Sequence, residues 1–267
     1  PPRQGGKVPA RQLVALAAGV GLVALADLAP APAPTVLLVI LGLAVMAVML
    51  RLDTRAPVRL LPRGAADPRT AVGAGYGAMF ALMAASMGLT VYGPALLQIL
   101  HGLSPLWAGY VIAAQAMAWT LAAFAVSGVD GGAPERRCIR TGGILISSGV
   151  LGLMLALPGA PLPAVILAAA VTGVGFGMSS SLMNRRILGK LDGDDRATGA
   201  SAFIAVRQSG GAVGAAVAGA AANAVGFGIA PGVASAQAAS TWVFATGVPF
   251  AMLGTWAAWR LTRPPCS

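Results

Sequence analysis

The sequence predicts an all-α, polytopic membrane protein with eight transmembrane helices. Hydrophobic residues make up 57% of the 267 residues and charged residues only 10%, which is more apolar than an ordinary soluble domain. The apolar residues gather in runs long enough, at about 1.5 Å of rise per residue, to cross a hydrocarbon layer about 30 Å thick. Seventeen of the 18 Lys and Arg residues fall in every second segment between these runs, so they would all lie on the same side of a membrane. A soluble bundle has no reason to show this alternation.

A helical hairpin sets the plan that the other spans repeat. Residues 71–97 leave the basic side, an uncharged turn containing His101 reverses the chain, and residues 106–126 return to an arginine-rich loop. Proline-rich turns without charge, such as 30–34 and 158–163, reverse the chain elsewhere because proline stops helix propagation. The predicted spans are residues 12–29, 35–50, 71–97, 106–126, 141–157, 164–183, 197–225 and 241–259. Residues 226–240 form a predicted outer loop.

The spans divide into two groups. Residues 1–51 carry two helices, residues 52–70 form a solvated connector rich in Arg and Pro, and residues 71–267 carry six helices. By the positive-inside rule the basic side faces the cytoplasm, which puts both ends of this segment on the cytoplasmic side of the cell membrane. The chain begins with Pro1 and shows no signal peptide, so we expect it to continue upstream.

Arg207 is the basic residue that falls within a predicted span. A charge at this depth is costly unless it faces the bundle interior, a wet cavity or a partner, and this makes it a candidate functional residue. The alternative is a side chain that extends to the headgroups and anchors the helix. Polar or aromatic residues in other spans, including Tyr92, Gln115 and Trp119, are candidates for the wall of a cavity or for contacts between helices.

The sequence contains little that indicates an enzyme. No nucleophile, metal or phosphate-binding motif stands out, and the two cysteines, Cys138 and Cys266, form neither a disulfide framework nor a metal cluster. We therefore expect no catalysis and no cofactor. The net charge of +10 does not indicate nucleic acid, because the basic residues flank apolar spans. Asp27 is the one acid inside a predicted span, close to the outer surface, and an acid that couples transport to protons would lie outside this sequence.

Four segments resemble the major facilitator superfamily. Residues 88–98 (GLTVYGPALLQ) and 101–109 (HGLSPLWAG) resemble the hairpin of the seventh and eighth core helices of its drug exporters. Residues 127–137 (SGVDGGAPERR) resemble a degraded copy of its cytoplasmic G-x-x-x-D-R-x-G-R-R loop, with Gly131 in place of the Arg after the Asp. Residues 200–219 resemble the penultimate helix of the fourteen-helix drug:proton antiporter branch.

This resemblance implies a C-terminal six-helix bundle preceded by two extra helices, with an N-terminal six-helix half missing. It implies alternating access around a central site, with a hydrophobic or cationic small molecule and protons as partners, in addition to the bilayer. The implied substrate-binding residues are Tyr92, Gln115, Trp119 and Arg207. The implied gating residues are Asp130, Arg136 and Arg137.

Other functions stay open at this point. A non-catalytic permease subunit or scaffold would fit an eight-span protein that works with another chain. A metabolite exporter of the same superfamily would share the fold, because one fold hosts many substrates. An integral-membrane transferase is disfavoured, because the sequence lacks a cluster of Asp, Glu or His at a membrane face.

Overall fold

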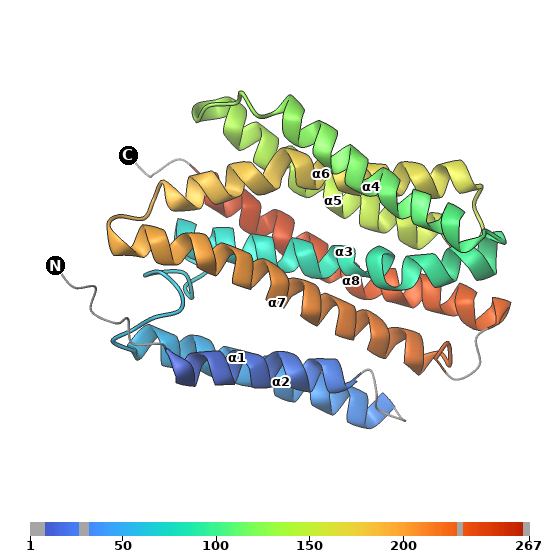
Figure 1. Ribbon diagram of the computed structural model, residues 1–267, viewed down its shortest axis with the longest axis horizontal. Helices are drawn as coiled ribbons and strands as arrows, with labels where there is room; N and C mark the ends of the chain where they lie inside the picture. The colour runs from blue at the N-terminus through green and yellow to red at the C-terminus, as the bar shows by residue number, and fades with distance from the viewer. Residues whose placement is uncertain (1–8, 27–31, 229–231, 264–267) are drawn as a thin grey trace.

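The computed structural model describes residues 9–26, 32–228 and 232–263, and eight α-helices make up its regular structure there. The helices run alternately up and down along one bundle, joined mostly by short turns (Figure 1). Their bounds are α1 (Ala10–Leu25), α2 (Pro32–Arg55), α3 (Ala71–His101), α4 (Pro105–Ala125), α5 (Gly132–Ala156), α6 (Leu162–Leu188), α7 (Asp194–Ala224) and α8 (Val233–Leu261).

Five of these helices, α2 to α6, are long and apolar enough to cross a membrane. Helix α1 is apolar but has only 16 residues, whereas α7 and α8, with 31 and 29 residues, are long enough but contain many Ala, Gly, Ser and Thr residues. The described part of the chain is therefore that of a multi-pass membrane protein. Crossing by α1, α7 and α8 stays a prediction.

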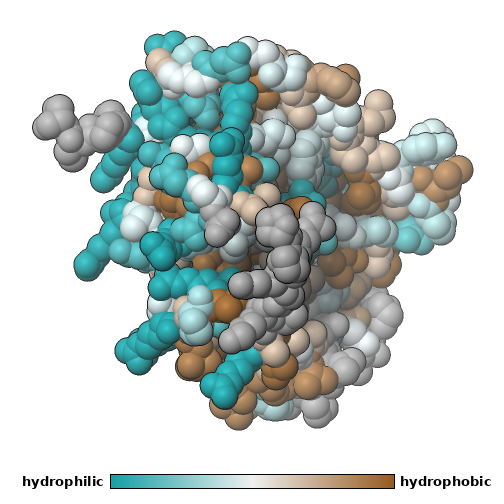
Figure 2. Space-filling model, turned by 60° about the vertical axis from the view of Figure 1, so that its left-hand side comes forward, coloured by the Kyte–Doolittle hydropathy of each residue, from teal (hydrophilic) through white to brown (hydrophobic). Residues whose placement is uncertain are grey.

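The alternating helices bring the basic residues together. Every described Lys and Arg except Arg207 lies near the start of α1, α5 or α7, near the end of α2, α6 or α8, or in the segments next to them. These positions share one end of the bundle, here called the basic end, on the left of Figure 1. Hydrophilic side chains gather over this end, whereas brown, apolar residues cover much of the rest of the surface (Figure 2).

Several helices extend beyond the predicted spans. Residues 132–140, predicted as part of a loop, form the first turns of α5, and residues 233–240, predicted as an outer loop, begin α8. Membrane length alone does not limit a helix, because Glu, Arg, Ala and Gln favour helix whether or not lipid surrounds them. The glycines Gly131 and Gly132 have φ values of 53° and 65°, a left-handed conformation that glycine adopts without strain, and they set the start of α5.

Helix α3 is the central helix of the bundle. Within an apolar stretch of 18 residues, 61% of α3 is buried, against 22% in α4 and 17% in α2. It packs against α7 and α8, while α5 packs against α6 and α8, α4 against α6, and α1 against α2 and α7. One apolar core around Met79, Leu82 and Phe176 fills the half nearer the basic end. A second core around Leu89 and Leu153 fills the opposite half.

Glycines allow the tightest helix contacts. A Cβ atom built on Gly210 would lie 2.3 Å from the carbonyl oxygen of Phe80, and one built on Gly214 would lie 2.2 Å from that of Ala84. Helices α7 and α3 therefore contact each other through their backbones. They run parallel, since both contacts advance by four residues along each helix. Helix α6 approaches α4 equally closely, because a Cβ atom built on Gly173 would lie 2.1 Å from the carbonyl oxygen of Gln115. Small residues have this role at membrane helix interfaces, because they let backbones approach closely.

We expect Gly214→Ala to destabilise the protein, because the new methyl group must push α7 away from α3. Overpacking of this kind typically costs about 1–3 kcal/mol. The measurement is the apparent melting temperature of the purified protein in detergent. Gly109→Ala in α4 is the matched control, since a Cβ there meets nothing within 4 Å and Ala favours helix over Gly. Equal melting temperatures for the two variants would contradict the backbone contact.

Candidate functional site

Arg207 lies 14th in the 31 residues of α7, about 20 Å along the helix from its start. Its position shares a helix face with Gly214, seven residues on, so it lies on the side of α7 that faces α3. The side chain is partly buried, and its Nε atom is buried without a hydrogen-bond partner in the described residues. A guanidinium donor left unsatisfied at this depth is the strongest indication of an external partner within the bundle.

The other predicted substrate-binding residues lie on α3 and α4. Tyr92 is partly buried and packs against the second apolar core, in the half of the bundle away from the basic end. Gln115 is 8% exposed, at the point where α4 touches Gly173 of α6. Trp119 packs against the first core and stacks on Phe176, with ring centroids 4.9 Å apart and an interplanar angle of 18°.

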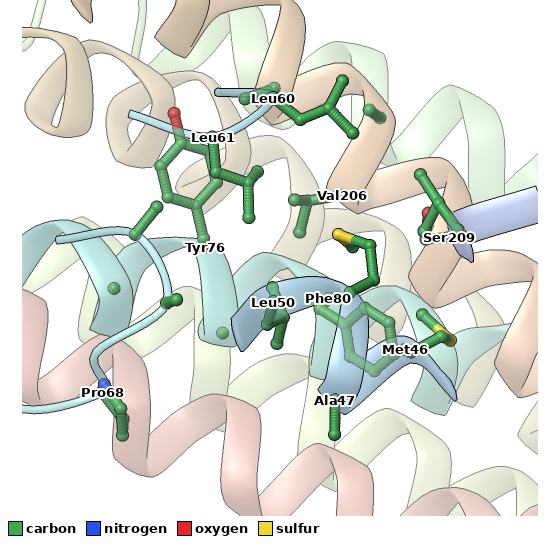
Figure 3. A pocket seen from close by; sticks show the side chains of 18 of the residues that line it. Met46, Ala47, Leu50, Leu60, Leu61, Pro68, Tyr76, Phe80, Val206 and Ser209 are labelled. Carbon is green, nitrogen blue, oxygen red and sulfur yellow. The ribbon is translucent and has the colours of Figure 1, made fainter. Parts of the chain in front are cut away.

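The structure spreads these residues along the bundle. Because Gly210 touches Phe80, Arg207 stands level with α3 residues before Phe80, whereas Tyr92 comes 12 residues after it. The two residues are therefore about 20 Å apart along the helix axis. None of the four predicted residues lines the cavity of about 470 Å³ that opens between α2, α3 and α7 (Figure 3). A shared site for all four stays a prediction that depends on surfaces outside this chain.

The predicted gating residues lie at the basic end. Asp130, in the turn between α4 and α5, accepts a hydrogen bond from Arg185 of α6 at 3.3 Å, and Arg185 also donates to the carbonyl oxygen of Val129. The Asp130 side chain is 94% exposed, so water screens this ion pair. Arg136 is partly buried and Arg137 is exposed in the first turns of α5. Neither arginine takes part in the two ion pairs of the described residues.

The buried ion pair of this end involves a different acid. Glu135 receives a hydrogen bond from Arg186 at 3.1 Å, and the two side chains are only 6% and 16% exposed. Arg186 also donates through Nε to the carbonyl oxygen of Leu261, the last residue of α8, at 3.2 Å. A pair sheltered from water interacts more strongly than an exposed one, and the loss of one member leaves an uncompensated charge.

A second arginine joins α5 to α8. Arg140 donates through Nε to the hydroxyl of Thr262 at 2.8 Å and through its terminal nitrogen to the carbonyl oxygen of Thr262 at 3.2 Å. Its guanidinium also lies over the ring of Trp259, 4.9 Å from the centroid. The start of α5 and the ends of α6 and α8 are thus held together by Glu135, Arg186, Arg140 and Thr262, here called the basic-end network.

Sequence reasoning placed Glu135 only in a loop and did not predict the basic-end network. The sequence does show that Glu135 is an acid next to the arginines of α5, and this indicates an ion pair. It does not show which arginine is the partner. Which arginine Glu135 binds depends on how α5 and α6 pack. Asp27 and Cys266 lie outside the described residues. In the part of the chain that is described, no group of three or more His, Cys, Asp or Glu residues could hold a metal ion.

Comparison of the chain with known protein families and with curated proteins finds no match. The candidate site offers an unsatisfied arginine on α7, polar and aromatic residues on α3 and α4, and a basic end held by a hydrogen-bonded network.

We expect Glu135→Gln to destabilise the protein far more than Asp130→Asn. Removal of one member of a buried pair typically costs about 3–5 kcal/mol, because Arg186 stays buried without its counter-charge. Loss of an exposed pair costs about 0–1 kcal/mol. The measurement is the apparent melting temperature of each purified variant, and equal shifts would show that burial does not distinguish the two pairs.

Proposed function

We propose that this chain is the C-terminal portion of a secondary active transporter of the major facilitator type, which exports hydrophobic or cationic small molecules in exchange for protons. The observation that carries the proposal is Arg207, a cation far from either end of α7 whose Nε atom is buried without a partner in the described residues. A protein does not retain such a group in lipid for packing alone, because it costs free energy unless it is paired or reached by water.

An acidic partner for Arg207 has to come from outside the described residues. All seven acids whose backbone is described lie at the basic end, near the ends of α2, α5 and α7 or in the segments between helices. None of these positions is level with the middle of α7. An acid supplied by a second helical bundle would neutralise Arg207 in one conformation and be released in another, and this is the coupling that alternating access requires.

The remaining geometry supports rigid-body movement. The basic-end network fixes α5, α6 and α8 to one another, and the glycine contacts fix α7 to α3 and α6 to α4. All the partners belong to the same six helices, so the network stiffens this group and does not itself tie it to another domain. A stiff half that rocks against a second half around a central site is the movement proposed for such transporters.

We expect Arg207→Ala to abolish export while the protein still inserts in the membrane. The measurement is resistance to a panel of exported compounds, in cells that express the complete native protein, together with its abundance in the membrane. Arg196→Ala is the matched control, because Arg196 is exposed near the start of α7. Unchanged resistance to every compound that the unaltered protein exports would remove Arg207 from the site.

A second candidate function is a non-catalytic membrane subunit that works with another chain. It is favoured by the spread of Tyr92, Gln115, Trp119 and Arg207, which form no common pocket within this chain. The intact mass of the native protein distinguishes the candidates. We expect about twice the 26.5 kDa of this chain, since six further helices would lie upstream. A native mass near 26.5 kDa would favour the subunit.

A further inference from the structure

An open space against the described helices lies beside Arg207, since Val206 and Ser209 line it although Arg207 does not. A cavity of about 470 Å³ opens toward the basic end between α1, α2, α3, α7 and the connector (Figure 3). The connector is here residues 56–70, because residues 52–55 of the predicted connector belong to α2. Its volume falls in the range of about 300–1,000 Å³ that is usual for small-molecule sites. We propose that this cavity binds one acyl chain of an anionic phospholipid, whose phosphate lies among the arginines beside its mouth.

The wall of the cavity is suited to hydrocarbon. Its lining is dominated by aliphatic, aromatic and Met side chains, including Leu16, Met46, Leu50, Leu61, Phe80 and Val206. Two of the three polar side chains in the wall have partners, and the third is Ser209: the Tyr76 hydroxyl donates to the carbonyl oxygen of Gly199 at 2.9 Å, and the Ser201 hydroxyl donates to that of Thr198 at 2.9 Å. A polar ligand would lose its hydrogen bonds to water here without replacement, whereas an acyl chain has none to lose.

The connector is fixed in place at the mouth. Asp53, which is 2% exposed, accepts hydrogen bonds from the backbone N–H groups of Leu60 at 2.6 Å and Leu61 at 3.0 Å. Gln12 of α1 donates to the carbonyl oxygen of Val58 at 3.0 Å. These bonds tie the connector to both α1 and α2, so one side of the cavity is a built wall and not a free loop.

The charge beside the mouth is strongly positive. Residues 51–70 carry five arginines and two acids, and Arg59, Arg63 and Arg69 are next or close in sequence to residues that line the cavity. Asp53 is occupied by the connector backbone, and Asp67 accepts a hydrogen bond from the backbone N–H of Arg69 at 2.8 Å. Neither ion pair of the described residues involves these arginines.

Apolar walls and arginines together select the occupant. A neutral apolar molecule would pack against the apolar walls but would form no ionic interaction with the arginines. A soluble anion would interact with the arginines but would not pack against the walls. An anionic phospholipid of the cytoplasmic leaflet satisfies both, since basic segments beside membrane helices attract anionic headgroups. Lipid binding of this kind requires only that the protein lies in a membrane, and it is independent of any transport activity.

The test measures lipid binding to the purified full chain by native mass spectrometry after delipidation. Phosphatidylglycerol and phosphatidylcholine with identical acyl chains are titrated in parallel, each also carrying a photoreactive group in the acyl chain. We expect one phosphatidylglycerol per chain to bind at least about tenfold more tightly than phosphatidylcholine. We expect the photoreactive chain to label cavity residues such as Met46 and Phe80.

Two matched pairs of variants separate the cavity from the charge. Gly77 lines the cavity and a Cβ there meets nothing within 4 Å, so Gly77→Phe should fill the space without a backbone clash; Gly109→Phe on α4 is equally open but does not line the cavity. The combined change of Arg59, Arg63 and Arg69 to Gln removes charge at the mouth. The control changes Arg136, Arg137 and Arg263 to Gln at the same end of the bundle.

We expect Gly77→Phe and the mouth variant each to lose at least about tenfold in phosphatidylglycerol affinity, and both controls to keep it. Equal binding of the two lipids would overturn the assignment of an anionic headgroup. Undiminished binding or unchanged labelling in Gly77→Phe would overturn the cavity as the site. If Gly77→Phe does not fold, Ala47→Phe fills the cavity from α2 and decides the same question.

Discussion

The close approach of α7 and α8 to the central helix α3 is the contact on which the bundle depends. Within lipid, apolar side chains gain little by leaving one apolar environment for another, so helices associate through close packing. Gly210 and Gly214 give α7 direct contact with the α3 backbone, and Gly247 and Gly254 of α8 would place a Cβ 2.8 Å from Ala85 and 2.7 Å from Leu82. The burial of α3 follows from these contacts, whereas α4 and α5 are placed by their own packing against α6.

The charged residues distinguish the two ends of the bundle. Their collection at one end leaves the middle of the bundle almost without charge, and the basic-end network uses part of that excess to join α5, α6 and α8. Glu135 and Arg186 give up water to pair, which is favourable only because their hydrogen bonds compensate for the lost hydration. Arg207 is the exception to this arrangement, and the proposed function rests on its position within α7.

The pair of helices α1 and α2 is attached in a different way. It contacts α7, while the connector is held by side-chain bonds from Asp53 and Gln12. The cavity lies along this junction, so the six-helix group and the helix pair meet partly across open, apolar space. A lipid chain in that space would complete the packing between the two groups and make their contact sensitive to the composition of the membrane.

Much of the fold could be predicted from the sequence. Apolar runs and alternating charge determined eight helices, their order and the basic end, because lipid requires every spanning segment to satisfy its own backbone hydrogen bonds. That Arg207 lies within a helix, apart from the other basic residues, could also be predicted from its place in an apolar run. Helix ends such as the start of α5 at Gly132 were predicted less well, because hydropathy marks where lipid ends and not where hydrogen bonding ends.

Tertiary structure alone decided which groups meet. That Glu135 binds Arg186 and not one of the neighbouring arginines depends on how α5 crosses α6. The separation of Tyr92 from Arg207 depends on the register of α3 and α7, which glycine contacts set. The cavity depends on where the connector folds back against α2. The sequence by itself determined which segments form apolar helices and which form basic loops, since that depends on each segment's own residues and the surrounding solvent. Three-dimensional packing determined which side chains contact one another.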